Sequence, residues 1–383
     1  MAEKRYLFTP GPTPVPPEVL AAMSQPIVHH RGPDFKPVYK RCLERLAQVF
    51  RTETEVLLYT SSGTGTLEAA TANLCSPGER IVVVSAGYFG ERWAKIGETY
   101  GCDVDHLRYE WGENPSPEEL AVRLEELGGA TAVFVTQSET STGVVADVRS
   151  LAAVAKEAGA LVCVDAISSL GAVPCETDEW SLDVVVSGSQ KALMTPPGLA
   201  MTSVSEAAWE ARERATLPRY YFDWALTREA QRKLDAAFTP AVSIVIGLDV
   251  ALAMLLELGL EAAFDHHIRL GRACREGVKA MRLELFSPDE DSSAVVTAVR
   301  MPDGIDADVL LVDLRDRFGI TFAPGQGPLK VRILRIGHIG FFDVFDITTA
   351  LAGLELGLAE AGADVERGVA VTRALETYER TPA

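Results

Sequence analysis

Residues 187–193 read Ser-Gly-Ser-Gln-Lys-Ala-Leu and are followed by Pro-Pro-Gly at 196–198. This stretch comes directly after the apolar run 182–186, which is typical of a short buried strand. A lysine at the end of such a strand is partly withdrawn from water, and desolvation lowers the pKa of its ammonium group. Lys191 is therefore a candidate nucleophile, although a lysine in a loop more often lies on the surface.

A second polar residue, Asp165, ends the apolar run 161–164 and leads into Ala-Ile-Ser-Ser-Leu-Gly at 166–171. An aspartate in this position is usually a turn or helix-capping residue. Paired with Lys191, it meets the requirements of pyridoxal phosphate: a carboxylate keeps the pyridine nitrogen protonated, and the lysine carries the cofactor as a Schiff base.

The two stretches 165–171 and 187–191 together resemble the class V aminotransferases, which belong to the fold-type I pyridoxal phosphate enzymes. The chain is most similar to the alanine–glyoxylate and serine–pyruvate (or serine–glyoxylate) branch. The similarity extends from Pro-Gly-Pro at 10–12 to Arg-Ile-Gly-His-Ile-Gly at 335–340. It implies an α/β fold in which a large domain has a mostly parallel seven-stranded sheet and a smaller C-terminal domain is α+β. We expect an N-terminal arm at 1–16, a large cofactor-binding domain at 17–262 and a small domain at 263–383.

Charge and composition exclude several classes of partner. The 383 residues suffice for two domains, and a formal charge of −18 argues against binding to nucleic acid or to anionic membranes. The six cysteines lack CxxC spacing, so neither a disulfide framework nor a zinc site is expected. The first 20 residues hold no apolar segment typical of an export signal, and no 18-residue apolar run follows. We therefore expect a cytoplasmic protein without bound metal.

Apolar strands alternate with helices through the first half of the chain. The expected strands are 80–85, 102–107, 131–136, 161–165 and 182–187, and the expected helices are 91–100, 117–127 and 148–158. Continuously apolar strands in this alternation indicate a parallel sheet that is covered on both faces. Ligands of such sheets gather at the carboxyl ends of the strands, where Asp165 and Lys191 are expected.

The resemblance also assigns contacts to the cofactor. Ser62, Gly63 and Thr64 open a helix and match the family's turn around the cofactor phosphate; exposed N–H groups at such a position suit an anion, although the residues alone favour an ordinary Ser/Thr cap. Phe89, with Tyr88 as the substitute, matches the family's aromatic residue on the cofactor face; a core position is the alternative.

Four further residues follow from the same resemblance. Thr140 is expected to direct a hydroxyl toward the cofactor ring, and Gln190 to pack beside the lysine. Thr239 matches the threonine that reaches the phosphate of a neighbouring subunit, which implies a homodimer with active sites near the interface. The family usually has a tyrosine just upstream, whereas this chain has Asp-Ala-Ala at 235–237, so this contact is expected to be weaker or built differently. Gly11, in the proline-rich arm, is expected to approach the substrate.

Arg335 is expected to bind the substrate carboxylate, because a guanidinium fork matches a carboxylate with two hydrogen bonds. A structural salt bridge is the alternative for this residue. His338, in the same glycine-bounded turn, is interpreted as structural. We see no second arginine that is dedicated to a dicarboxylate, although Arg31, next to His30, would serve if its loop covered the site.

The resemblance implies a transaminase that moves an amino group from alanine or serine to glyoxylate or pyruvate by a ping-pong mechanism, although Arg335 by itself does not separate these substrates from aspartate. Lys191 would act as general base and Asp165 would keep the ring cationic. Alternatives are an aspartate-directed aminotransferase and a cysteine desulfurase or lyase of the same class, although the residue before the lysine is Gln190 rather than histidine. A nicotinamide-dependent dehydrogenase is disfavoured because no strand is followed by GxGxxG, and a non-catalytic binding module needs none of the three charged residues.

Overall fold

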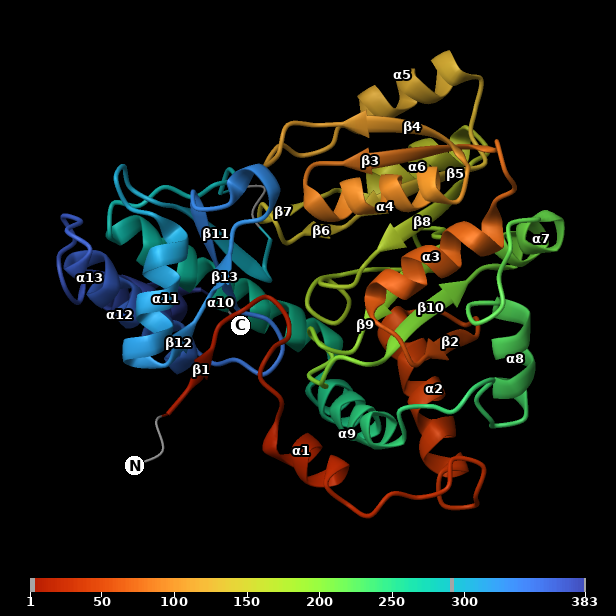
Figure 1. The fold of residues 1–383 in the computed structure, drawn as a ribbon, viewed down its shortest axis with the longest axis horizontal. Helices are drawn as coiled ribbons and strands as arrows, with labels where there is room; N and C mark the ends of the chain where they lie inside the picture. The colour runs from red at the N-terminus through yellow and green to blue at the C-terminus, as the bar shows by residue number, and fades with distance from the viewer. Residues whose placement is uncertain (1–3, 290–292, 382–383) are drawn as a thin grey trace.

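The computed structural model describes residues 4–289 and 293–381, so the first three residues of the predicted arm and the last two of the predicted small domain lie outside it. A seven-stranded sheet, in the order β2-β10-β9-β8-β5-β3-β4, forms the centre of the first half (Figure 1). Its strands are β2 (Val56–Tyr59), β3 (Arg80–Ser85), β4 (Asp103–Arg108), β5 (Ala132–Thr136), β8 (Leu161–Asp165), β9 (Val184–Gly188) and β10 (Ala200–Val204). Only β10 runs antiparallel to its neighbours, which confirms the predicted sheet.

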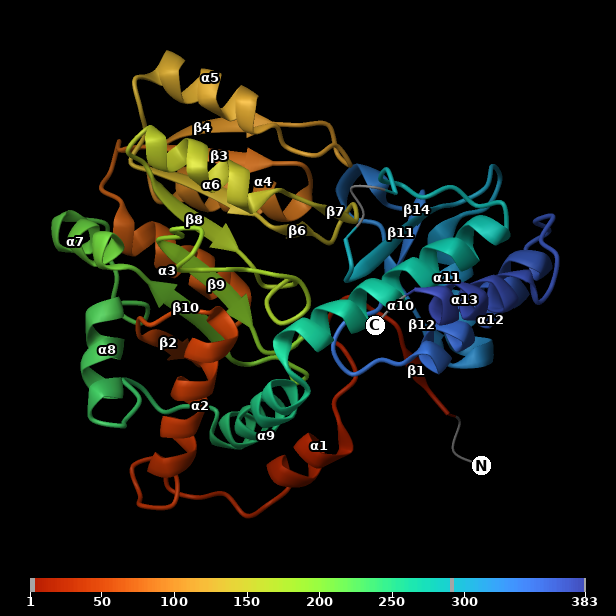
Figure 2. The ribbon, with the colours of Figure 1, turned by 180° about the vertical axis from the view of Figure 1, so that it is seen from behind.

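Both faces of this sheet are buried. In β5, Val133 and Val135 belong to one core cluster, whereas Phe134 between them belongs to the other. One face is covered by α2 (Lys36–Phe50), α5 (Pro117–Leu127), α6 (Val148–Glu157) and α9 (Val242–Leu258). The other is covered by α3 (Gly63–Leu74), α4 (Tyr88–Thr99), α7 (Glu206–Arg214) and α8 (Trp224–Arg232), as Figures 1 and 2 show from opposite sides. Burial on both faces explains why the strands read as continuous apolar runs.

The second half of the chain has its own sheet and core. Strands β11 (Val296–Arg300), β14 (Ile333–Gly337) and β13 (Ala323–Pro324) pair antiparallel in that order. The core beside them is formed with α10 (Leu260–Ala280), α11 (Ala307–Phe318), α12 (Val344–Glu360) and α13 (Val369–Arg380). The predicted boundary at 262/263 falls in the first turn of α10, and the division into domains stays a prediction.

Helices α9 and α10 meet at Gly259, which adopts a φ of +89°. Among the described residues, no single helix is long and apolar enough to cross a membrane. The two helices meet the length and composition criteria only as a pair, and that pair is bent by 87°. Several apolar residues of α9, such as Leu248 and Leu252, are fully buried in the core against the large sheet.

The N-terminal arm is attached to the second half of the chain. Strand β1 (Tyr6–Leu7) pairs in parallel with β12 (Ile320–Thr321). The N–H of Gly337 donates a hydrogen bond to the carbonyl oxygen of Phe8 at 2.7 Å, and a Cβ on Gly337 would lie 2.4 Å from Thr9. The arm then continues past the carboxyl edge of the large sheet to α1 (Pro17–Met23).

Candidate active site

Lys191 and Asp165 lie at the same edge of the large sheet. Asp165 ends β8, and Lys191 follows the neighbouring parallel strand β9 by three residues. Burial lowers the pKa of Lys191 to about 8, with a further lowering by Arg335 and an opposing effect of Asp165. Burial raises the pKa of Asp165 to about 6, while the N–H of Ile167, at 2.9 Å, favours its ionised form. Each group affects the pKa of the other, so the structure brings the two predicted residues into one site.

The N-terminal arm contacts the lysine directly. The Nζ atom of Lys191 donates a hydrogen bond to the carbonyl oxygen of Pro10 at 2.6 Å, and the hydroxyl of Thr13 donates to the carbonyl of Lys191 at 3.1 Å. Gly11 has a φ of +140°, and a Cβ added to it would lie 2.4 Å from Nζ and Cε of the lysine. The arm therefore approaches the lysine this closely only with glycine at position 11, and the approach of Gly11 to the substrate stays a prediction.

The predicted phosphate site lies at the start of α3. Ser62 is the N-cap residue, but its side chain makes no capping hydrogen bond, so the simple Ser/Thr cap is not what the structure shows. The first N–H groups of a helix without such a cap are available to an anion. Thr64 accepts a hydrogen bond from Nη1 of Arg92 at 3.1 Å. A Cβ on Gly63 would lie 2.4 Å from the side chain of Ile167, two residues beyond Asp165, so this turn packs directly on the aspartate loop.

Phe89 lies in the first turn of α4 and is only half-buried. It belongs to neither core cluster of the large sheet, which disagrees with the alternative of a core position. The guanidinium of Arg92 lies 4.9 Å from the centre of its ring, and the ring of Tyr88 meets it edge-on at 5.6 Å. A ring fixed in this way is suited to stack on a flat heteroaromatic group.

Arg335 lies on β14 and is 5% exposed. Its Nε donates to the carbonyl of Pro324 at 2.9 Å and its Nη1 to the carbonyl of Thr140 at 2.7 Å. Throughout residues 4–289 and 293–381 no carboxylate forms an ion pair with it, so this part of the chain gives no support to the alternative of a structural salt bridge. Burial lowers its pKa to about 10, with an opposing effect of Glu139. A buried guanidinium without a counterion is suited to bind a carboxylate from a ligand.

The remaining predicted residues have mixed environments. Thr140 is buried and binds Arg335 through its backbone, so the role of its hydroxyl stays a prediction. The side-chain oxygen of Gln190 is buried and, within the described chain, has no hydrogen-bond partner. His338 is fully buried between Thr297 and the carbonyl of Ala294, and burial lowers its pKa to about 3, as a structural histidine requires.

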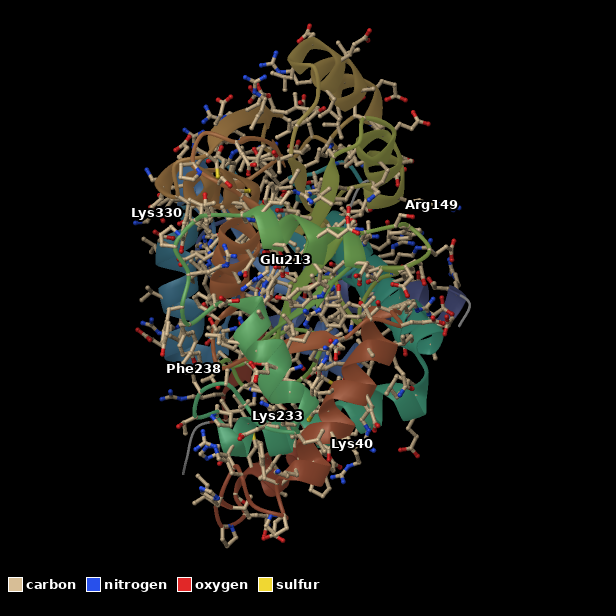
Figure 3. The ribbon with its side chains drawn as sticks, turned by 90° about the vertical axis from the view of Figure 1, so that its right-hand side faces the viewer. Lys40, Arg149, Glu213, Lys233, Phe238 and Lys330 are labelled. Carbon is tan, nitrogen blue, oxygen red and sulfur yellow. The ribbon has the colours of Figure 1, made fainter. Side chains whose placement is uncertain are left out.

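Thr239 is exposed and lies on the loop that follows α8, whose Ala241 donates a backbone hydrogen bond to the hydroxyl of Thr60 at 2.9 Å. It follows Phe238, whose ring stacks on Tyr221 at 4.7 Å (Figure 3 labels Phe238). Arg31 is exposed and pairs with Asp235 of the same loop at 3.1 Å. These contacts place Arg31 beside the 235–239 loop and give no evidence that it binds substrate.

Sequence patterns do not identify two residues of the site, Arg92 and Glu139. Arg92 connects Thr64 to Phe89, as described above. Glu139 is buried, and its carboxylate accepts hydrogen bonds from the backbone N–H groups of Phe89 and Gly90. Neither residue belongs to a sequence motif that indicates a role in the site. Only their contacts with residues distant in the sequence identify them.

These groups fit pyridoxal phosphate. The buried amine of Lys191 and the buried carboxylate of Asp165 belong to one site, the uncapped N-terminus of α3 suits its phosphate, and the unpartnered oxygen of Gln190 offers a further polar contact. Ser62, Gly63, Thr64, Phe89, Thr140 and Gln190 are thus the residues that would surround it, with Lys191 and Asp165 at its reactive ends.

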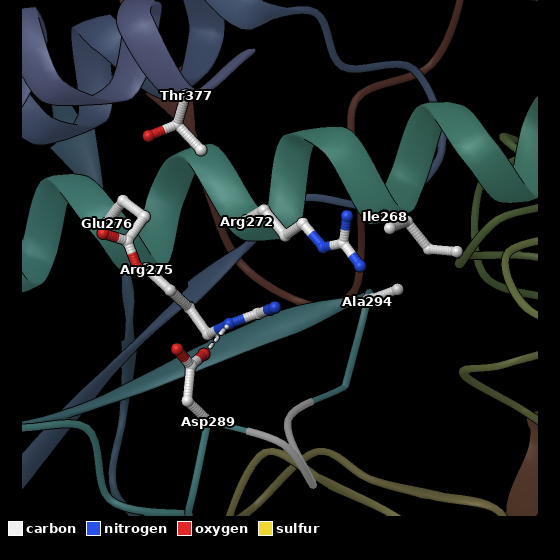
Figure 4. A pocket seen from close by; sticks show the side chains of 7 residues that line it. All are labelled: Ile268, Arg272, Arg275, Glu276, Asp289, Ala294 and Thr377. Carbon is white, nitrogen blue, oxygen red and sulfur yellow. Dashed lines mark hydrogen bonds and ion pairs between the residues drawn. The ribbon is translucent and has the colours of Figure 1, made fainter. Parts of the chain in front are cut away.

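A surface cavity of about 620 Å³ lies elsewhere, along α10 (Figure 4). It is lined by Ile268, Arg272, Arg275, Glu276, Asp289, Ala294 and Thr377. Arg275 is already ion-paired with Asp289 at 2.7 Å, and none of the predicted site residues lines this cavity. It is therefore separate from the candidate active site.

Comparisons with known proteins agree with this geometry. The family model for "Aminotransferase class-V" matches residues 5–331. A protein named soluble hydrogenase 42 kDa subunit, from Anabaena cylindrica, is 42% identical over 94% of this chain and 95% of its own length. An L-aspartate–glyoxylate aminotransferase from Paracoccus denitrificans is 34% identical and covers 100% of this chain and 98% of its own length.

Two more similarities concern glyoxylate enzymes. A serine–glyoxylate aminotransferase from Methylorubrum extorquens is 34% identical over 99% of this chain and 97% of its own length. The crystal structure of the ureidoglycine–glyoxylate aminotransferase of Bacillus subtilis matches with a TM-score of 0.94 and 31% identity, and 99% of each chain is covered.

Proposed function

Because this chain belongs to the class-V aminotransferase family, whose cofactor is pyridoxal phosphate, we propose that it transfers the amino group of alanine or serine to glyoxylate or pyruvate. The observation that carries this proposal is Arg335, a buried guanidinium that forms no ion pair with a carboxylate of the described chain and that lowers the pKa of Lys191. Aspartate is the second candidate donor, since the Paracoccus relative is named for it.

Each residue then has a defined task. Pyridoxal phosphate, when bound, supplies an electron sink for the electron pair that remains when the Cα–H bond of the substrate breaks. Arg335 binds the substrate carboxylate and thereby orients the Cα–H bond. The amine of Lys191, whose pKa is lowered to about 8, accepts the proton at Nζ and returns it. Asp165 stabilises a proton on the ring nitrogen, and burial strengthens this pairing.

The remaining contacts position the reactants. Ser62, Gly63 and Thr64 would hold the phosphate, Phe89 would face the ring, and Thr140 and Gln190 would supply polar contacts to it. Gly11 forms the substrate side of the site through its backbone. Arg31, the arginine considered for a distal carboxylate, is paired with Asp235, and this favours small donors such as alanine and serine.

We further propose a cytoplasmic homodimer. Tyr220 is 74% exposed and packs with Tyr221 against Phe238, which precedes Thr239. An exposed aromatic cluster of this kind is typical of a subunit contact, and it would carry Thr239 toward the neighbouring subunit. All six cysteines are free thiols, which is consistent with a reducing compartment.

The function is tested by a half-reaction screen. The purified protein, loaded with pyridoxal phosphate, is mixed with alanine, serine, aspartate or cysteine, and the change in visible cofactor absorbance is followed. Alanine or serine should react fastest and yield the matching 2-oxo acid, and Lys191→Ala should show no reaction. Release of sulfide from cysteine without a 2-oxo acid would identify a desulfurase instead, and absence of cofactor binding would refute the proposal.

The shared site is tested by subunit mixing. Lys191→Ala and Thr239→Asp chains should each be inactive alone, the second because a carboxylate repels the phosphate. Mixed dimers would contain one site with an intact Lys191 and an intact Thr239, so mixing should restore activity. Light scattering that gives the mass of a monomer would contradict the proposed dimer.

A further inference from the structure

Glu139 is a buried acid to which the chemistry above gives no task. It ends the short strand β6 (Ser138–Glu139) and is 3% exposed. Its Oε2 accepts hydrogen bonds from the N–H groups of Phe89 at 3.0 Å and Gly90 at 3.1 Å. Its Oε1 accepts from the N–H of Ser141 at 3.1 Å and from the hydroxyl of Ser141 at 2.5 Å. All four partners are donors, so the site requires the acceptor-only ionised carboxylate.

On one side Glu139 caps a helix from fifty residues away. Gly87, the N-cap residue of α4, has no side chain to satisfy the first N–H groups of the helix. The carboxylate of Glu139 takes that role, and an acid is stabilised at the positive end of a helix. A Cβ on Gly87 would lie 2.5 Å from Cγ of Glu139, so glycine is needed for this approach.

On the other side Glu139 belongs to the turn that binds Arg335. The next residue, Thr140, accepts the Nη1–H of Arg335 through its carbonyl. Ser141, which is bonded twice to Glu139, also accepts the N–H of Tyr88 at 3.0 Å. The turn 139–141 thus contacts both the start of α4 and the arginine of β14.

We propose that Glu139 is a positioning residue that couples the cofactor face of the site to its carboxylate-binding arginine. One carboxylate is hydrogen-bonded both to the first turn of α4 and to the turn 139–141. It therefore fixes the position of Phe89 relative to that of Arg335. The inference rests on the proposed function of these two residues. A glutamine at 139 would keep the shape but turn an amide NH₂ toward N–H or O–H donors, and the two segments would separate.

The chain offers a matched control. Glu355 is also buried, at 4% exposed, and accepts two backbone hydrogen bonds at the start of a helix, from Gly368 at 2.8 Å and Ala370 at 2.7 Å. It lies in the C-terminal core beside α13. Glu139→Gln and Glu355→Gln therefore each remove a carboxylate that caps the start of a helix. Of the two residues, only Glu139 contacts the candidate site.

The experiment compares the two variants with the wild type. It measures the melting temperature, the Kd of the cofactor-free protein for pyridoxal phosphate, the KM for the amino donor, and amide hydrogen exchange of peptides that cover 86–93 and 139–143. Glu139→Gln should raise both the Kd and the KM at least about tenfold, the loss expected for one charge-assisted hydrogen bond. It should also speed exchange in both peptides, whereas Glu355→Gln should change only the melting temperature.

Several results would overturn the inference. One is a Kd and KM of Glu139→Gln within threefold of those of Glu355→Gln; another is a change in Kd alone, which would make Glu139 a local cap. Ser141→Ala removes one hydrogen bond to Glu139 and serves if the glutamine variant does not fold: it should shift Kd and KM together by a smaller factor. If the wild type binds no cofactor, the proposed function fails, while joint exchange at 86–93 and 139–143 still tests whether Glu139 holds the two segments.

Discussion

Replacing Gly11 with alanine tests the contact between the N-terminal arm and the reactive lysine. The new Cβ would lie 2.4 Å from Nζ and Cε of Lys191, where 3.4–4 Å is an ordinary contact. The lysine or the arm must therefore move by about 1 Å. The amine has little freedom to do so, because it donates a hydrogen bond to the carbonyl of Pro10 at 2.6 Å, next to the substituted residue.

The cost follows from this displacement. A reacting group misplaced by about 1 Å loses roughly a hundredfold in rate. A hundredfold loss in kcat/KM corresponds to about 2.7 kcal/mol in the barrier. The φ of +140° at Gly11 adds backbone strain of about 1–3 kcal/mol to the folded state, which should lower the melting temperature as well.

The control is Gly101→Ala. Gly101 also has a positive φ, +82°, but a Cβ there would meet nothing within 4 Å. It should lower the melting temperature without changing kcat/KM for alanine and glyoxylate, whereas Gly11→Ala should lower both. A kcat/KM of Gly11→Ala within threefold of the wild-type value would refute the claim that the arm sets the position of the lysine.

Three further predictions concern the charged residues. Arg335→Lys keeps the charge but loses the planar fork, so the KM for the amino donor should rise about 10- to 100-fold in steady-state assays, and an unchanged KM would contradict its role. Asp165→Asn should leave the cofactor bound but lower kcat about 10²- to 10³-fold in single-turnover experiments, because the site loses a preorganised charge; a loss below threefold would remove Asp165 from the chemistry. Since burial lowers the pKa of Lys191 to about 8, the reactive neutral amine of the cofactor-free protein increases with pH up to that value. Stopped-flow capture of pyridoxal phosphate should therefore speed up about tenfold from pH 6.5 to 7.5 and level off above about 8.5; a rate that still climbs at pH 10 would indicate an unperturbed lysine.

The strands of the large sheet could be predicted where burial on both faces makes the sequence continuously apolar. The strands 80–85 and 161–165 were predicted with their observed bounds, because strands covered on both faces are apolar throughout. Strand β10 was not predicted, since its sequence Ala-Met-Thr-Ser-Val has no continuous apolar run. It is fully buried nonetheless, because two strands flank it and helices cover it. Its burial depends on the whole sheet and not on its own residues.

Helix α4 shows the same limit in another way. Its start was expected at Glu91, whereas it begins at Tyr88. The local sequence has only Gly87 as N-cap, and the group that satisfies the first N–H groups is Glu139, from another segment. Local capping patterns predict a helix start only when the cap lies within a few residues of it.

The residues of the site also fall into a group that local sequence identifies and a group that it does not. Lys191, Asp165 and Arg335 were singled out because each is a charged residue in a recognisable motif at an expected strand end, although the structure places Arg335 in the middle of β14. Arg92 and Glu139 have no such local signal: they were found through Thr64 and Phe89, which they contact in the folded chain. Sequence patterns thus identified the groups assigned to the reaction, whereas the groups that hold them in place required the structure.

The glycines of the Arg-Ile-Gly-His-Ile-Gly turn connect these observations. Gly337 admits the arm, since a Cβ there would lie 2.4 Å from Thr9, and Gly340 admits the lysine backbone, since its Cβ would lie 3.0 Å from the carbonyl oxygen of Lys191. The turn therefore does more than present Arg335: it brings the N-terminal arm and the lysine loop to the same place. Glycine is thus required at 11, 337 and 340 by close contacts among the arm, the turn and the lysine loop. A larger residue at any of the three should displace a segment that lies beside Lys191.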